Sequence, residues 1–233
     1  MKKPYTHYKL GLLFSLLTIV LPAVASAEKP QSESLKGLPL IATEDFEHGT
    51  RDWKPTDNSA WEIQQEGNNH VFSLIKKKSN YEPPVRSPYN RAIYQGGEFA
   101  DVILDLKLQS TSPDYNHRSL CLFFGYQDES HFYYVHFGKK TDDHANQIFI
   151  VNDAPRTKIS TKTTPGTNWD DEWHHARVIR KVQDGTIEIY FDDMETPIMT
   201  ATDKTFQHGR IGIGSFDDPG RFDDIKIYGN PIK

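Results

Sequence analysis

Short stretches in which apolar and polar positions alternate run from residue 40 to the end of the chain. In residues 102–108, valine or leucine occupies every even position, whereas Asp105 and Lys107 lie at odd positions. A period of two is typical of half-buried β-strands, whose side chains point alternately to the two faces of a sheet. On this pattern we predict strands at residues 40–47, 60–65, 71–76, 98–108, 119–126, 132–137, 147–151, 173–182, 186–192, 197–201, 209–216 and 222–228.

Turn-forming Gly, Pro, Asn and Asp residues separate these runs, and no stretch of a dozen residues shows the apolar stripe of an amphipathic helix. Many short strands with frequent turns indicate an all-β sandwich or barrel. We find no internal repeat and no linker after residue 40. We therefore predict one domain over residues 40–233, built as two stacked sheets with a shared core.

The first 27 residues have the order of a secretory signal peptide. Three lysines accompany an apolar run at 10–24, and Ala25-Ser26-Ala27 follows it. The apolar run is shorter than the roughly 20 residues of a transmembrane helix. We expect removal of residues 1–27, a secreted or periplasmic protein without a membrane anchor, and a disordered polar lead at 28–39.

The charge balance changes once this segment is removed. The chain has 27 basic and 32 acidic residues, and loss of three lysines lowers the net charge from −5 to −8. An acidic excess argues against a nucleic-acid partner and against an anionic membrane surface. Cys121 is the single cysteine and lies in an apolar strand, which favours an inert core thiol and excludes an intrachain disulfide. Without disulfides, an exported domain depends on its core or on a metal ion.

Several motifs resemble the concanavalin A-like lectin/glucanase superfamily, in particular its laminin-G-like jelly rolls of secreted bacterial proteins. They are W-H-H-A-R-V at 173–178, Y-F-D-D at 190–193, G-R-I-G-I-G at 209–214, F-D-D-I-K-I-Y at 222–228 and E-D-F-E-H-G at 44–49. The strands F-G-Y-Q-D at 124–128 and Y-Y-V-H-F at 133–137 are similar to bacterial domains named 3-keto-disaccharide hydrolases. The resemblance implies a jelly-roll β-sandwich of two antiparallel sheets. Because the superfamily includes lectins, binding modules, hydrolases and lyases, it implies a carbohydrate partner and leaves the activity open.

The resemblance also implies a structural calcium ion that joins the first and last strands. It maps the carboxylate ligands onto Asp45 and Asp223, with backbone carbonyls near Gly49 as further ligands. Calcium takes six to eight oxygen ligands, which suits such a set. The alternative is that both acids are solvated charges at strand ends.

The second candidate site is the face of the predicted sheet that points away from the core. In residues 132–137 the odd positions are expected in the core, so Tyr134 and His136 lie on the opposite face. Gln147 and Phe149 join them from the next strand. In jelly rolls that the chain resembles, this face is the sugar-binding groove, where aromatic rings stack on sugars and polar groups bind hydroxyls.

Charge supports this placement. Segment 117–162 holds six basic residues, five acidic residues and four histidines, whereas the rest of the mature chain is clearly acidic. This favours a polar or anionic ligand such as an anionic polysaccharide. The acid–base candidates are Tyr134 and His136, and the ligand-binding candidates are Arg118, Lys139, His144, Asn146, Gln147, Phe149 and Arg156.

Three functional hypotheses remain open: a carbohydrate-binding module, a polysaccharide lyase or glycoside hydrolase that uses Tyr/His chemistry, and a structural laminin-G-like domain. The Glu-x-Asp-x-x-Glu strand of laminarinase-type glycosidases and the Gly-x-Ser-x-Gly elbow are both absent from the sequence. Adjacent His174 and His175 point to opposite faces of a strand, which disfavours a shared zinc ion. The proline-rich loop at 81–88 is expected to be rigid, and its Arg86 could close one end of the groove.

Overall fold

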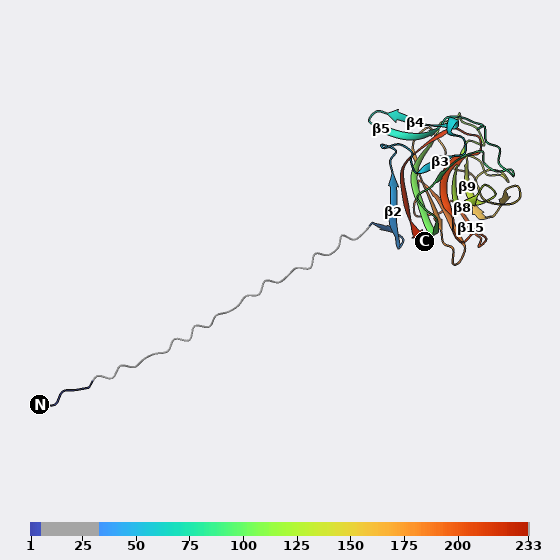
Figure 1. The fold of residues 1–233 in the computed structure, drawn as a ribbon. Helices are drawn as coiled ribbons and strands as arrows, with labels where there is room; N and C mark the ends of the chain where they lie inside the picture. The colour runs from blue at the N-terminus through green and yellow to red at the C-terminus, as the bar shows by residue number, and fades with distance from the viewer. Residues whose placement is uncertain (6–32, 233) are drawn as a thin grey trace. The chain divides into compact units, whose positions relative to one another are not determined.

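The computed structural model describes residues 1–5 and 33–232, and Figure 1 shows that the domain consists of β-strands. Most of the predicted signal peptide and lead, residues 6–32, lies outside the described residues. Within the described ranges there is no apolar helix of membrane-spanning length. The single helical element of the described residues is a short 3-10 turn at Asn58–Ala60.

A ten-stranded sheet forms one layer. Its spatial order is β1 (Ser34–Leu35), β2 (Leu38–Glu44), β17 (Gly220–Pro231), β7 (Phe99–Ser110), β13 (His174–Arg180), β14 (Thr186–Phe191), β15 (Met199–Thr202) and β12 (Ser160–Thr163). A hairpin of β4 (Trp61–Glu66) and β5 (Asn69–Leu74) joins it through β17. Thus the last strand pairs with β2, and the two ends of the domain lie in neighbouring strands.

A seven-stranded sheet forms the second layer. Its order is β11 (Thr157–Lys158), β10 (Gln147–Asn152), β9 (His131–Gly138), β8 (Ser119–Asp128), β16 (Arg210–Ser215), β6 (Asn90–Tyr94) and β3 (Trp53–Pro55). The strand pairs in both sheets are antiparallel, as in the predicted β-sandwich. Strands β16 and β17 follow each other along the chain but belong to different sheets, so the short turn between them crosses the sandwich.

The main core lies between the sheets. Leu104 and Val178 of the ten-stranded sheet belong to the same buried cluster as Val135 and Phe137 of the seven-stranded sheet. The prediction of which alternate side chains of these strands face the core is therefore confirmed. All twelve predicted strands are also present. Five strands were not predicted: β1, β3, β6, β11 and β12.

The disordered lead predicted at residues 28–39 is wrong at its C-terminal end. Strand β1 and the start of β2 form a hairpin there. Lys36 and Gly37 between them have φ values of 48° and 84°, the positive pair that a two-residue hairpin turn requires. Leu38 packs against Tyr190 and Tyr228 in a buried cluster on the outer side of the ten-stranded sheet, so apolar burial orders this segment.

Candidate functional site

The outer face of the seven-stranded sheet is covered along most of its length. Tyr134 and Phe149 point away from the core as predicted, but they are only 0% and 1% exposed. Their rings stack at 5.1 Å, and Val85 of the loop at 81–88 packs on their cluster. The backbone amide of Arg156 donates to the carbonyl of Arg86 at 3.0 Å and joins this loop to the segment after β10. The prediction of an open groove across this face is therefore wrong, because the proline-rich loop fills it.

The covered face opens at one end into a pocket of 450 Å³, which we call the His136 pocket. Its walls come from strand β9, the loop at 81–88, and the segments that precede β8, precede β10, follow β10 and follow β16. The residues that line it are Arg86, Tyr115, His117, His136, His144, Arg156, Phe216 and Asp217.

His136 is held in one protonation state by its neighbours. Its Nε2 lies 2.8 Å from the Ser119 hydroxyl, and that hydroxyl lies 3.1 Å from a carboxylate oxygen of Asp218. Because the carboxylate accepts only, Ser119 donates its single proton to Asp218, and His136 Nε2–H donates to Ser119. His136 Nδ1 then accepts from Arg156 at 3.4 Å. Burial, reinforced by the charge of Arg156, lowers the pKa of His136 to about 3, so the ring is neutral near pH 7.

Arg156 is the best-positioned cation of the pocket. Its Nη1 donates to the Tyr134 hydroxyl at 2.9 Å, and its guanidinium lies 4.8 Å from the Phe149 ring centre and 4.5 Å from that of Phe216. Aromatic faces stabilise a cation in this position and hold its plane. Among the described residues, Nε and Nη2 of Arg156 have no hydrogen-bond partner, so both can donate to a ligand.

Charged groups of both signs surround the pocket. Arg86 and Arg156 line it together with one carboxylate, Asp217, and the carboxylates of Asp218 and Asp142 lie behind it, bonded to the lining residues Tyr115 and His117. Partial exclusion of water, followed by the charge of Asp218, raises the pKa of Asp217. The arrangement offers cationic donors and a neutral imidazole to a polar anion.

Comparison with solved structures identifies the fold. No family model matches the chain, and no curated protein matches it by sequence. The winged bean acidic lectin complexed with methyl-α-D-galactose aligns with a TM-score of 0.54 and 12% identity over 82% of this chain and 98% of the lectin. The chain has the concanavalin A-like lectin/glucanase fold.

Two bacterial structures share this concanavalin A-like fold. Carbohydrate-binding module CBM66 from Bacillus subtilis has a TM-score of 0.52 and 15% identity over 76% of this chain and 96% of the module. Domain 4 of the arabinanase AbnA from Geobacillus stearothermophilus, in complex with arabinotriose, has a TM-score of 0.53 and 10% identity over 83% and 94%. At these identities the likeness concerns the concanavalin A-like fold alone.

Five predicted ligand-binding residues of the concanavalin A-like domain lie outside the pocket. Phe149 is buried in the covered outer face, and two of the other four are bound by neighbouring loops. Arg118 is 2% exposed and donates to the carbonyl of Ser110 at 2.7 Å and to Asp171 at 2.9 Å. Lys139 pairs with Asp114. Both cations stabilise the loops around β8, and neither lines the His136 pocket.

The other two residues hold the segment before β10. Asn146 is fully buried, donates to the Thr141 hydroxyl at 2.7 Å and accepts from the Thr167 hydroxyl at 2.7 Å. Gln147 donates to the carbonyl of Asp142 at 3.0 Å. These amides satisfy loop polar groups, which is the usual role of buried side-chain amides.

Three predicted site residues line the pocket of the concanavalin A-like domain: His136, His144 and Arg156. Tyr134 supports Arg156 from beneath but has no exposed surface, and burial raises its pKa far above the ordinary range, so it cannot serve as the predicted base. Four lining residues were not predicted from the sequence: Tyr115, His117, Phe216 and Asp217. They meet the others because β16 lies beside β8, and strand order is not encoded in periodicity.

The predicted metal ligands lie at the opposite sheet. Asp223 is 5% exposed; its Oδ2 accepts from Asn69 at 2.8 Å, while its Oδ1 has no hydrogen-bond partner among the described residues. Burial raises the pKa of Asp223, and the charge of Asp45 adds to this effect. The described residues contain no cluster of three His, Cys, Asp or Glu side chains suited to a metal. An ion at Asp223 would therefore need backbone carbonyls or water to complete its ligand set.

Proposed function

We propose that this protein is an exported, non-catalytic carbohydrate-binding domain that holds an acidic saccharide in the His136 pocket. The observation that carries the proposal is the convergence of Arg86 and Arg156 on one pocket with a single lining carboxylate. A guanidinium matches a carboxylate or sulfate group in plane and can donate two parallel hydrogen bonds to it. The concanavalin A-like fold, shared with a lectin and a carbohydrate-binding module, agrees with a saccharide as the ligand.

Arg156 is prepared for this role before the ligand arrives. Its contacts with Tyr134 and two aromatic rings fix the side chain, so little rotamer entropy remains to be lost on binding. The neutral state of His136 removes a third positive charge and leaves the arginines as the main anion contacts. The pocket is thus pre-organised around Arg156, with the exposed Arg86 as its second contact.

The same geometry disfavours catalysis. Asp217 is the only carboxylate that lines the pocket, whereas glycosidases of the usual kind need a pair. Tyr134 is inaccessible, and His136 takes up a proton only at strongly acidic pH. Binding without bond cleavage therefore accounts for the pocket better than lyase or hydrolase chemistry does.

Export and calcium belong to the same proposal. The signal-peptide pattern at residues 1–27 supports a secreted or periplasmic location. We propose that calcium binds Asp223 through its unbonded Oδ1, with Asp45 as the second carboxylate. When bound, the ion would supply positive charge that stabilises the two carboxylates and ties the end of β2 to β17.

The test is equilibrium binding of acidic and neutral oligosaccharides to the mature domain, with product release measured in parallel. Arg86→Ala removes an exposed cation and is expected to weaken acidic binding about tenfold, close to the value of one charge-assisted hydrogen bond. Arg51→Ala is the matched control, because Arg51 is exposed and lies outside the His136 pocket. Equal affinities of the two variants would refute the pocket assignment, and released product would refute the non-catalytic role.

A further inference from the structure

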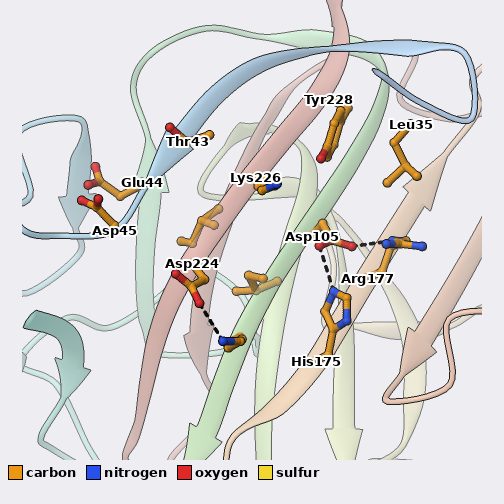
Figure 2. Close-up of a pocket in the computed structure, with 13 residues that line it drawn as sticks. Leu35, Thr43, Glu44, Asp45, Asp105, His175, Arg177, Asp224, Lys226 and Tyr228 are labelled. Atoms are coloured by element: carbon orange, nitrogen blue, oxygen red, sulfur yellow. Dashed lines mark hydrogen bonds and ion pairs between the residues drawn. The ribbon is translucent and has the colours of Figure 1, made fainter. Parts of the chain in front are cut away.

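A second pocket lies on the outer face of the ten-stranded sheet, and we call it the Asp105 pocket (Figure 2). Its volume is 620 Å³. Strands β17, β7 and β13 form the floor, and the β1–β2 hairpin forms a wall through Leu35. Asp105 alternates with the core residues Leu104 and Leu106, so it points away from the His136 pocket and toward the opposite surface of the sandwich.

The wall of this pocket is fastened to the sheet. Glu33, just before β1, accepts hydrogen bonds from the Tyr228 hydroxyl at 2.6 Å and from Lys226 at 3.0 Å. Leu38 packs against Tyr228 in the outer buried cluster, and Leu35 packs at its edge. The hairpin therefore forms a fixed rim over β17 and β7.

The floor carries an ordered polar network. Arg177 of β13 is directly opposite Asp105 of β7, and His175 lies two pairs further along, opposite Lys107 and on the same face. Asp105 accepts from His175 Nε2 at 2.8 Å through one oxygen and from Arg177 Nε through the other, as the dashed lines in Figure 2 show. Burial acts to raise the pKa of Asp105, but the bonds and charges of His175 and Arg177 outweigh it and hold that pKa below its usual value.

Each member of this network keeps free hydrogen-bonding capacity. Within the described part of the chain, Nη1 and Nη2 of Arg177 and Nδ1 of His175 have no partner. The Asp105 oxygens each retain a second lone pair. A carboxylate beside a guanidinium offers one acceptor and two donors in a fixed geometry, which matches a pair of neighbouring sugar hydroxyls that each donate and accept.

The charge of this pocket differs from that of the His136 pocket. Four carboxylates and three cationic side chains line it, so the balance is close to neutral. All three cations are paired: Lys107 with Asp224 at 2.8 Å, Lys226 with Glu33, and Arg177 with Asp105. This environment offers no net attraction to an anion and suits an uncharged ligand.

We infer that the Asp105 pocket is a second saccharide site, specific for an uncharged sugar with neighbouring free hydroxyls. The two pockets open on opposite outer faces of the sandwich, so one domain can hold an acidic glycan and a neutral glycan at once and join two chains. The joining role rests on the proposed function of the His136 pocket, whereas neutral-sugar binding at Asp105 does not.

The experiment titrates the mature domain with neutral oligosaccharides in a calorimeter and compares two variants. Arg177→Lys keeps the positive charge but loses the free Nη pair, and it is expected to weaken neutral-sugar binding about tenfold. Thr43→Trp fills the pocket from the exposed side of β2 and leaves the Asp105 network unchanged, so it separates ligand blocking from loss of folding. Melting temperatures and circular dichroism verify that both variants fold.

Neutral-sugar binding that is lost in both variants and retained in Arg86→Ala supports the second site. Absence of neutral-sugar binding in the unmodified domain, or binding that survives Thr43→Trp, overturns it. If instead the proposal for the His136 pocket is wrong, the domain will not bind acidic oligosaccharides but will still bind neutral ones. For the joining role, an immobilised acidic glycan should capture a labelled neutral glycan only when the domain is present, and Thr43→Trp should abolish that capture.

Discussion

The neutral state of His136 makes a prediction about stability against pH. The native ring has a pKa of about 3, whereas an unperturbed histidine in the unfolded chain titrates near 6.5. Below pH 6.5 the unfolded state binds a proton that the native state does not bind, so acidification favours unfolding. Between the two pKa values, each pH unit of acidification lowers the free energy of unfolding by about 1.4 kcal/mol. The step from pH 7 to pH 5 lowers it by about 2 kcal/mol.

The substitution His136→Gln isolates this contribution. Glutamine keeps an N–H donor for Ser119 but takes up no proton, so the variant should lack the His136 part of the acid sensitivity. Urea unfolding at pH 5, 6 and 7 gives the free energy of unfolding of both proteins. The difference between variant and unmodified protein should shift by about 2 kcal/mol in favour of the variant from pH 7 to pH 5.

The pH-dependent contributions of other titrating groups cancel when His136→Gln is compared with the unmodified protein. The contribution of His131 to the free energy of unfolding changes with pH in the opposite direction. Its bond to Asp128 raises its pKa, so its stabilising effect is present at low pH and is lost as pH rises. Both proteins carry this contribution, and it cancels in the difference. The same substitution at the exposed His48 is the matched control and should give no comparable shift. Parallel pH profiles for His136→Gln and the unmodified protein would refute the buried, neutral imidazole.

Three further predictions follow from particular contacts. Arg156→Leu should abolish acidic-glycan binding and lower the free energy of unfolding by about 1–3 kcal/mol, measured in urea, because the buried Tyr134 hydroxyl loses its partner. Calcium should raise the melting temperature of the unmodified protein but not that of Asp223→Asn; an equal response of both would eliminate the proposed ion site. The Cys121 thiol is fully buried and its pKa is raised mainly by burial, so a thiol reagent should label it only as fast as the protein unfolds; rapid labelling in native buffer would contradict this burial.

Strand positions and side-chain parity were predictable because apolar alternation is a local signal. Strand β6 escaped this signal because it carries Asn90 and Arg91, both of which are fully buried. Arg91 is accommodated by a 2.6 Å hydrogen bond to Tyr81 and by the Phe132 ring at 5.0 Å. Tyr81 lies in the preceding loop and Phe132 in a strand of distant sequence, and the local sequence does not show that either contacts Arg91.

The candidate site was predictable only in part for a related reason. The alternation of side chains along the strands correctly placed Tyr134, His136 and Phe149 on the outer face. Alternation alone does not show whether a loop covers that face. The loop at 81–88 determines which part of the face meets solvent, and it leaves the end at His136 accessible. Charge counting drew attention to Arg156, which lines the His136 pocket. For Arg118 and Asn146, only the structure shows that their polar groups are already bonded.

An acidic saccharide in the His136 pocket would contact Arg86 and Arg156. The most direct measurement is an NMR titration of the mature, isotope-labelled domain with an acidic oligosaccharide, observed at the arginine side-chain N–H groups and the histidine rings. Binding in the His136 pocket should give saturable shifts of the Arg156 Nε–H and the His136 ring, with Arg51 unchanged as the exposed reference. Shifts confined to residues away from this pocket, or no shifts with any acidic oligosaccharide, would contradict it.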